Sequence, residues 1–156
     1  MIFLRKYSRA DTFSEGWKTF RKRMSSTLNR WWDECYIVKR EELFAQALPR
    51  SSELDSIRVL EILGVLPEFR GCGIGEGLVH VVEDEMVAEG ANMKKRGIYV
   101  EANSESNVEM YLRWGFELKA EGHFQSELGD FDMWGLYKEL RESGLEKEHA
   151  TLQFQP

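Results

Sequence analysis

The chain has 156 residues, 42% of them hydrophobic and 12% aromatic, and a formal net charge of −6. This length suits a single domain, and this apolar content supports a hydrophobic core, which excludes a disordered chain or a coiled coil. The acidic balance argues against a nucleic-acid binder, and no apolar run is long enough for a membrane span or a signal peptide, so we expect a cytoplasmic protein.

The N-terminal third is expected to contain one strand and two helices. Apolar residues recur at three- and four-residue steps from Trp17 to Trp31, which predicts one amphipathic helix of about five turns. Thr12 and Glu15 have the spacing of a capping box at its start. The expected elements are a strand at 2–7, helices at 12–32 and 40–48, and a loop at 50–56. Residues 1–50 carry a charge balance of +5 against −11 for the remainder, so this part could attract an anion.

From residue 57 onward, strands and helices alternate. Residues 57–66 are β-branched and mostly apolar on both faces, as in a central strand. The helix after the next loop is expected to bury Leu78, Val79, Val82 and Met86. The remaining expected elements are a strand at 98–102, a helix at 107–114 that ends at Gly115, strands at 116–121 and 132–138, and a charged, helical or frayed tail from 139.

A glycine-rich loop lies between the strand and this helix, at residues 70–75, with the sequence R-G-C-G-I-G. Backbone amides and the helix dipole favour an anion at such a position. The dinucleotide pattern G-x-G-x-x-G is excluded, because Glu76 and Leu78 stand where its last glycine would be. The Walker pattern is excluded because no lysine follows the glycines. A plain strand–helix turn is the alternative interpretation.

The pattern that remains, R-x-x-G-x-G at 70–75, resembles the signature of the GNAT superfamily of acyl-CoA-dependent N-acyltransferases. The motif alone is weak, but its context is similar to the family on both sides. V-x-P-x-F-R at 65–70 leads into it, and N-x-x-x-Y-x-x-x-G-F at 107–116 resembles the family's second element. The resemblance covers about residues 57–138, and the sequence of this region looks most like that of fungal small-molecule acetyltransferases.

The resemblance implies an α/β (α+β) fold, with a GNAT-like mixed, mostly antiparallel central sheet flanked by helices. It implies a single N-acetyltransferase-like domain over 1–156, with a core at 57–138, a helical insertion at 12–48 and a tail at 139–156. The implied reaction is direct transfer of an acetyl group from acetyl-CoA, as cosubstrate, to an amine on a small molecule or a protein. Neither nucleic acid nor a membrane is expected as a partner, and homodimer formation is left open.

The family's motifs also imply roles for individual residues. Tyr111 would protonate the leaving thiolate, unless it is only a core tyrosine. Glu61 is the candidate base, since burial in an apolar strand would suit that role; a solvated glutamate is the alternative. Asn107 would bond the pantetheine arm or merely cap its helix. The remaining positions expected to bind the cofactor are the amides of Leu63 and Val65, beside a strand bulge, and the loop residues Arg70, Gly71, Cys72, Gly73, Ile74, Gly75 and Glu76.

Other reactive residues receive no role. Cys72 has no nucleophilic function to perform, because direct transfer needs none. The two cysteines, Cys35 and Cys72, suit neither a disulfide framework nor a zinc site, and no metal is expected. Trp31 and Trp32 would wall an acceptor site or pack in the core. The three histidines lack partners at metal or triad spacing and are expected at the surface: His80, His123 and His149.

The N-terminal part departs from the family pattern. A full member has a strand, two helices and a hairpin before the central strand, and here only residues 2–7 resemble any of these. The chain is either truncated, which would leave a sheet edge open near residues 2–7, or a compact variant that uses its own helices. The alternatives to an enzyme are a non-catalytic CoA-binding or interaction module and a subunit that completes its sheet with another chain.

Overall fold

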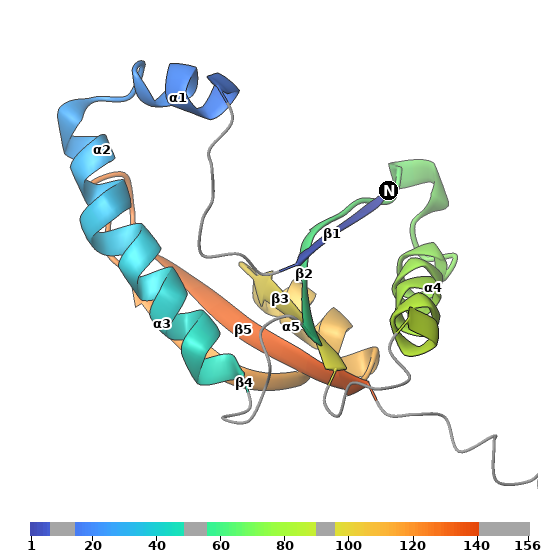
Figure 1. Cartoon of the computed structure of the whole chain (residues 1–156). Helices are drawn as coiled ribbons and strands as arrows, with labels where there is room; N and C mark the ends of the chain where they lie inside the picture. Colours follow the sequence, from blue (N-terminus) through green and yellow to red (C-terminus); the bar gives the residue numbers. More distant parts are fainter. Residues whose placement is uncertain (7–14, 49–55, 90–95, 141–156) are drawn as a thin grey trace, which may run out of the picture.

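The computed structural model describes residues 1–6, 15–48, 56–89 and 96–140. Within them, five strands form one sheet in the order β1-β2-β3-β5-β4, with helices on both faces (Figure 1). The strands are β1 (Ile2–Lys6), β2 (Ile57–Leu63), β3 (Arg96–Ala102), β4 (Glu117–Phe124) and β5 (Phe131–Leu140). The helical segments are α1 (Glu15–Arg21), α2 (Ser26–Trp31), the π-helical η1 (Trp32–Tyr36), α3 (Ile37–Ala47), the 3₁₀ turn η3 (Pro67–Phe69), α4 (Ile74–Glu89) and α5 (Glu105–Arg113).

The sheet is mixed and mostly antiparallel, as predicted from the resemblance. Only β2 and β3 run parallel, whereas β1–β2, β3–β5 and β4–β5 are antiparallel pairs. Alternate side chains of each strand enter two separate cores because successive residues point to opposite faces. Tyr99 packs under α3, while its neighbours Ile98 and Val100 pack against α4 and α5. The sheet is therefore buried on both sides, which explains the apolar sequence of β3.

Helix α3 is held close to the sheet by small residues and one aromatic pair. Leu43, Phe44 and Ala47 are its buried positions, and the Phe44 ring meets the Tyr99 ring edge-on at 4.8 Å. A Cβ at Gly135 would stand 3.2 Å from both Ala47 and Tyr99. Glycine at this position of β5 thus allows the helix to approach the strand.

The predicted single helix over 12–32 is wrong in its continuity. The chain turns after Arg21 and starts again at Ser26, because the Ser25 hydroxyl accepts a hydrogen bond from the Leu28 amide (3.1 Å) and caps α2. The Asn29 side-chain amide donates to the Arg21 carbonyl (3.0 Å) and so satisfies the end of α1. The apolar periodicity runs across this break, but no described residue of either short helix is buried, and Phe20 is 54% exposed.

The gap expected between the two N-terminal helices is also absent. Helix α2 continues through the π-helical turn η1 directly into α3, so the second helix begins at Ile37 rather than at residue 40. Its predicted end before Pro49 is confirmed, since α3 stops at Ala47. The predicted capping residue Thr12, nearly all of the 50–56 loop and the tail after residue 140 lie outside the described residues.

Strands β2 and β3 separate halfway along β2. Their pairing runs only from Ile57 with Gly97 to Leu60 with Val100. On the other side, the register with β1 shifts so that Glu61 is an extra residue of β2, which makes a bulge. The bulge expected beside Leu63 and Val65 therefore lies at Glu61, and the strand ends at Leu63 rather than at 66. The separation opens the sheet at the place where the glycine loop begins.

Candidate functional site

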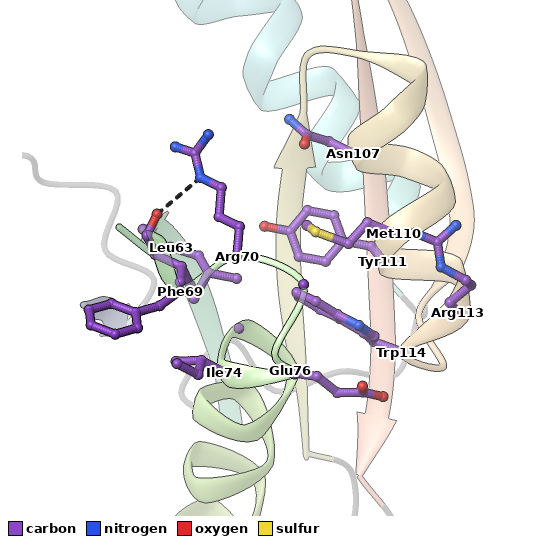
Figure 2. A pocket seen from close by; sticks show the side chains of 15 residues that line it. Leu63, Phe69, Arg70, Ile74, Glu76, Asn107, Met110, Tyr111, Arg113 and Trp114 are labelled. Carbon is purple, nitrogen blue, oxygen red and sulfur yellow. Dashed lines mark hydrogen bonds between the residues drawn. The ribbon is translucent and has the colours of Figure 1, made fainter. Parts of the chain in front are cut away.

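A cleft of about 700 Å³ lies where β2 and β3 have separated, between the start of α4 and the side of α5 (Figure 2). It gathers ten of the twelve residues predicted for the site from three distant parts of the chain. These are Leu63, Val65, Arg70, Gly71, Gly73, Ile74, Gly75, Glu76, Asn107 and Tyr111. Glu61 and Cys72 do not line the cleft.

The glycine loop presents unpaired backbone donors to the cleft. Gly71 and Gly73 have φ of +77° and +74°, a left-handed conformation that side chains disfavour. Among the described residues, no amide from Gly71 to Glu76 donates to a backbone carbonyl; the first such bond in α4 is from Gly77 to Gly73, at 2.9 Å. Open amides at the positive end of a 16-residue helix form a site for an anion.

Arg70 closes the loop onto the end of β2. Its Nε donates to the Val65 carbonyl at 3.1 Å, and the side chain extends along the cleft toward Asn107 (Figure 2). The 3₁₀ turn that precedes it is fixed by hydrogen bonds from the Phe69 amide to Leu66 (2.9 Å) and from the Arg70 amide to Pro67 (3.2 Å). A guanidinium held in this way adds positive charge beside the open amides.

The second wall of the cleft is one face of α5. Ser104 caps this helix by accepting from the Asn107 amide at 3.3 Å, so the expectation that Asn107 is the cap is wrong, and α5 begins at Glu105. The helix ends in the predicted way at Gly115, with φ of +83° and hydrogen bonds from Gly115 to Leu112 and from Phe116 to Tyr111. Both ends of the wall are therefore fixed by local bonds.

Tyr111 lies at the middle of this wall. Its ring is 7% exposed and packs edge-on against Trp114 (5.6 Å) and Phe116 (5.3 Å), while its hydroxyl points into the cleft (Figure 2). Burial raises the pKa of the Tyr111 phenol above its ordinary value. The side chain is thus a core residue whose hydroxyl faces the cleft and keeps its proton at neutral pH.

Five lining residues were not predicted from the sequence: Gly64, Phe69, Met110, Arg113 and Trp114. Helical spacing could have found two of them, because Met110 and Trp114 follow Asn107 by three and seven residues and share its face. Trp114 also explains Gly75, where a Cβ would stand 3.0 Å from the indole ring. The two walls of the cleft therefore touch at this glycine.

Glu61 is exposed, which contradicts the burial on which its selection as the base depended. Its position in the bulge turns it away from the apolar pattern of the strand. A partly buried carboxylate on β3 is Glu101, which faces α3 and accepts from Arg40 Nε at 2.7 and 2.9 Å. Cys72 is exposed as well.

Two further predictions concern side chains outside the cleft. Trp31 and Trp32 belong to an aromatic cluster with Tyr36, and Trp31 Nε1 donates to the Gln125 carbonyl at 2.6 Å. Both side chains are half-buried, and Trp31 also lines a small pocket apart from the cleft, so both predicted alternatives stay open. His123 is a surface residue as predicted, but it has a partner across the hairpin: its Nδ1 lies 2.7 Å from Asp132. This contact raises the pKa of His123.

No metal site or membrane span is found in the part of the chain that the structure describes. No group of three His, Cys, Asp or Glu side chains there could hold a metal ion. No helix there has the length and apolar character needed to cross a bilayer.

The comparisons with known proteins agree with this geometry. The family model described as acetyltransferase (GNAT) domain matches residues 32–118, more than half of the chain. No curated protein matches the chain in sequence. Arylalkylamine N-acetyltransferase 2 from Aedes aegypti is structurally similar, with a TM-score of 0.55 and 15% identity over 90% of this chain and 66% of that one.

Two other solved structures are similar at lower TM-scores. One is Arabidopsis thaliana NAA60 in complex with acetyl-CoA, with a TM-score of 0.47 and 22% identity over 64% of this chain and 58% of that one. The other is the ribosomal-protein-S18-alanine N-acetyltransferase from Escherichia coli, with a TM-score of 0.47 and 14% identity over 99% and 100%. The family match and the fold define the class of protein. The chain belongs to the GNAT acetyltransferase family.

Proposed function

We propose that the chain is an acetyl-CoA-dependent N-acetyltransferase whose acceptor is an amine on a small molecule or a protein. The observation that carries the proposal is the cleft itself: open amides at the start of α4 face the hydroxyl of Tyr111 across it. Phosphates bind at such amides, and a thioester attached to the same molecule would extend toward the separated strands. The choice of acetyl-CoA as the donor is supported by the similar NAA60 structure, which was solved in complex with acetyl-CoA.

The cleft fits this donor in shape and charge. The pyrophosphate would bind the amides of Gly71, Gly73 and Glu76, beside the guanidinium of Arg70. The pantetheine arm would follow the end of β2, with the amides of Leu63 and Val65 and the side chain of Asn107 as its polar partners. The catalytic core is then residues 57–138, within one domain over 1–156 that acts in the cytoplasm.

The proposed reaction is one direct displacement. The amine nitrogen attacks the thioester carbonyl carbon, a C–N bond forms, and the C–S bond breaks. Tyr111 gives its proton to the leaving thiolate, and Glu61 accepts a proton from the attacking amine. Glu61 retains this role as a prediction, and replacement with glutamine should lower kcat with little effect on CoA binding. No covalent enzyme intermediate is involved, so Cys72 is dispensable.

A second candidate is CoA binding without catalysis. It is favoured by one observation, the exposure of Glu61 outside the cleft. Both functions predict that CoA raises the melting temperature, because a ligand that binds only the folded chain stabilises it. They differ in thiol release from acetyl-CoA with a panel of amines. Amine-dependent release supports the enzyme, and a CoA-induced shift without release supports the binding module.

A further inference from the structure

Lys138 joins three elements behind the cleft. It lies on β5, and its Nζ is 2.5 Å from Glu83 Oε1 on α4 and donates to the Trp114 carbonyl at the end of α5, at 2.8 Å. The side chains of Lys138 and Glu83 are only 17% and 15% exposed. The ammonium also lies 5.8 Å from the centre of the Phe116 ring.

The chemistry of each contact explains the residue types. The Trp114 carbonyl is at the negative end of α5, where the last carbonyls lack helical partners and a cation is favourable. Glycine at position 115 is required by its φ of +83° rather than by space, because a Cβ there would stand in ordinary contact with Lys138 Cε at 3.5 Å. The carboxylate of Glu83 balances a charge that would be costly so far from water.

This one ammonium contacts both walls of the cleft, which also share a hydrophobic core. Helix α4 carries the glycine loop, and α5 carries Tyr111 and Trp114. The two walls come close at the cleft where the Trp114 indole lies beside Gly75. The carbonyl of the same Trp114 accepts a hydrogen bond from Lys138, which forms an ion pair with Glu83 of α4.

We propose that Lys138 is a positioning residue for acetyl transfer: it sets the spacing between the glycine loop and Tyr111. The inference rests on the proposed function, since it states how the chain keeps its proton donor at reacting distance from a thiolate anchored on α4. The loop amides are local and would still hold CoA without Lys138. The geometry of Tyr111 would not be kept, and small misplacements of a catalytic group are costly.

The test uses the full chain with Lys138→Met, a Lys138→Met/Glu83→Met double variant and the control Lys119→Met. Lys119 makes an exposed ion pair with Glu117 on β4. The single variant leaves Glu83 without its cation and loses stability; the double variant removes both charges, so it should regain stability and remain folded. Neither variant supplies a donor to the Trp114 carbonyl.

The expected result is a kcat about tenfold lower in both Lys138 variants, with a CoA dissociation constant changed less than about threefold. Hydrogen exchange at the amides of 77–80 and 112–116 should be about tenfold faster than in the wild type and in Lys119→Met. A wild-type kcat in the double variant would overturn the inference, because Lys138 would then act only by neutralising Glu83. If the wild type itself shows no turnover, the proposed function fails. Unchanged hydrogen exchange in the Lys138 variants would independently overturn the inference that Lys138 sets the spacing between the glycine loop and Tyr111.

Discussion

Gly73 has a φ of +74° at the point where the loop turns into α4, and nothing stands within 4 Å of where its Cβ would be. We expect Gly73→Val to abolish the rise in melting temperature that CoA causes, because the β-branched residue disfavours this backbone conformation and fills the space beside the open amides. Differential scanning fluorimetry with and without CoA measures the effect.

Gly129 provides the matched control for this substitution. It also has a positive φ, +121°, and open space around it, but it lies in the turn between β4 and β5 and does not line the cleft. Gly129→Val should lower the melting temperature of the free chain while the CoA-induced rise remains. If Gly73→Val still responds to CoA as the wild type does, the assignment of the loop is wrong.

Tyr111→Phe should lower kcat by about 100-fold and change CoA binding little, since the ring still packs and only the proton is lost. Burial raises the pKa of Tyr111 above its ordinary value of 10.0, so the wild type keeps the phenol form through neutral pH. Wild-type kcat should therefore fall only as the pH rises through that raised pKa, and the phenylalanine variant should lack this alkaline limb.

The control for Tyr111 is Tyr137→Phe, which changes a buried tyrosine in the opposite core and should leave kcat unchanged. The folded-state pKa of Tyr111 lies above the unfolded one, so its contribution to stability is complete below about pH 10 and is lost as the pH rises through the raised value. A Tyr111→Phe enzyme with wild-type kcat would remove the proposed proton donor.

Among single residues, the sequence predicted those cleft residues that act through their backbone or that belong to a family motif. Gly71 and Gly73 are examples, because the glycine loop lies between a strand and a helix, and Tyr111 is another, because it matches the family's second motif. The expectation that Glu61 is buried was wrong, because Glu61 is the extra residue of a bulge in β2 and is exposed. A bulge depends on the partner strand β1, which local sequence does not reveal.

Among the elements, α3 is joined to β3 by a partly buried ion pair. Arg40 Nε donates to both oxygens of Glu101, and the Tyr99 hydroxyl donates to Oε1 at 3.2 Å. Burial, with the neighbouring Glu101 carboxylate, raises the pKa of Tyr99. The network fixes the helix against the sheet at the point where β2 and β3 separate, on the face opposite α4 and α5.

Arg40→Met should reduce the free energy of unfolding by about 1–3 kcal/mol, because Glu101 would keep a charge with little access to water and no cation. The value is below that for a fully buried pair, since the Arg40 side chain is 30% exposed. Urea denaturation measures it, with Lys119→Met as the control that should change stability by less than about 0.5 kcal/mol. Equal losses in the two variants would show that the Arg40 pair behaves as a surface pair.

Element types were more predictable than element boundaries. Strands β2 to β5 and helices α4 and α5 have strong periodicity and clear stop signals such as Gly115, and all were expected at nearly their observed positions. The N-terminal helices were misjudged because Ser25 looks like any polar residue on a helix surface. Its capping role becomes visible only with the Asn29 side chain that closes the preceding turn.

In the whole molecule, one face of the sheet forms a packed core and the other face lies beside the cleft. Its α3 face is packed by aromatic and aliphatic side chains, and its other face holds α4 and α5 against a gap that opens into the cleft. The two family motifs lie at the start of α4 and along α5, so both contribute to the cleft. Strand β1 lies at the edge of the sheet within the described residues, paired only with β2.

The destination of the acetyl group is the most direct test of the proposed activity. Acetyl-CoA labelled with ¹³C in the acetyl group would be incubated with the chain and the amine that releases most thiol, and the products followed by mass spectrometry. We expect one labelled amide per thiol released, and loss of both in Gly73→Val but not in Gly129→Val. Thiol release without labelled amide, or equal amide formation by Gly73→Val, would contradict acetyl transfer in this cleft.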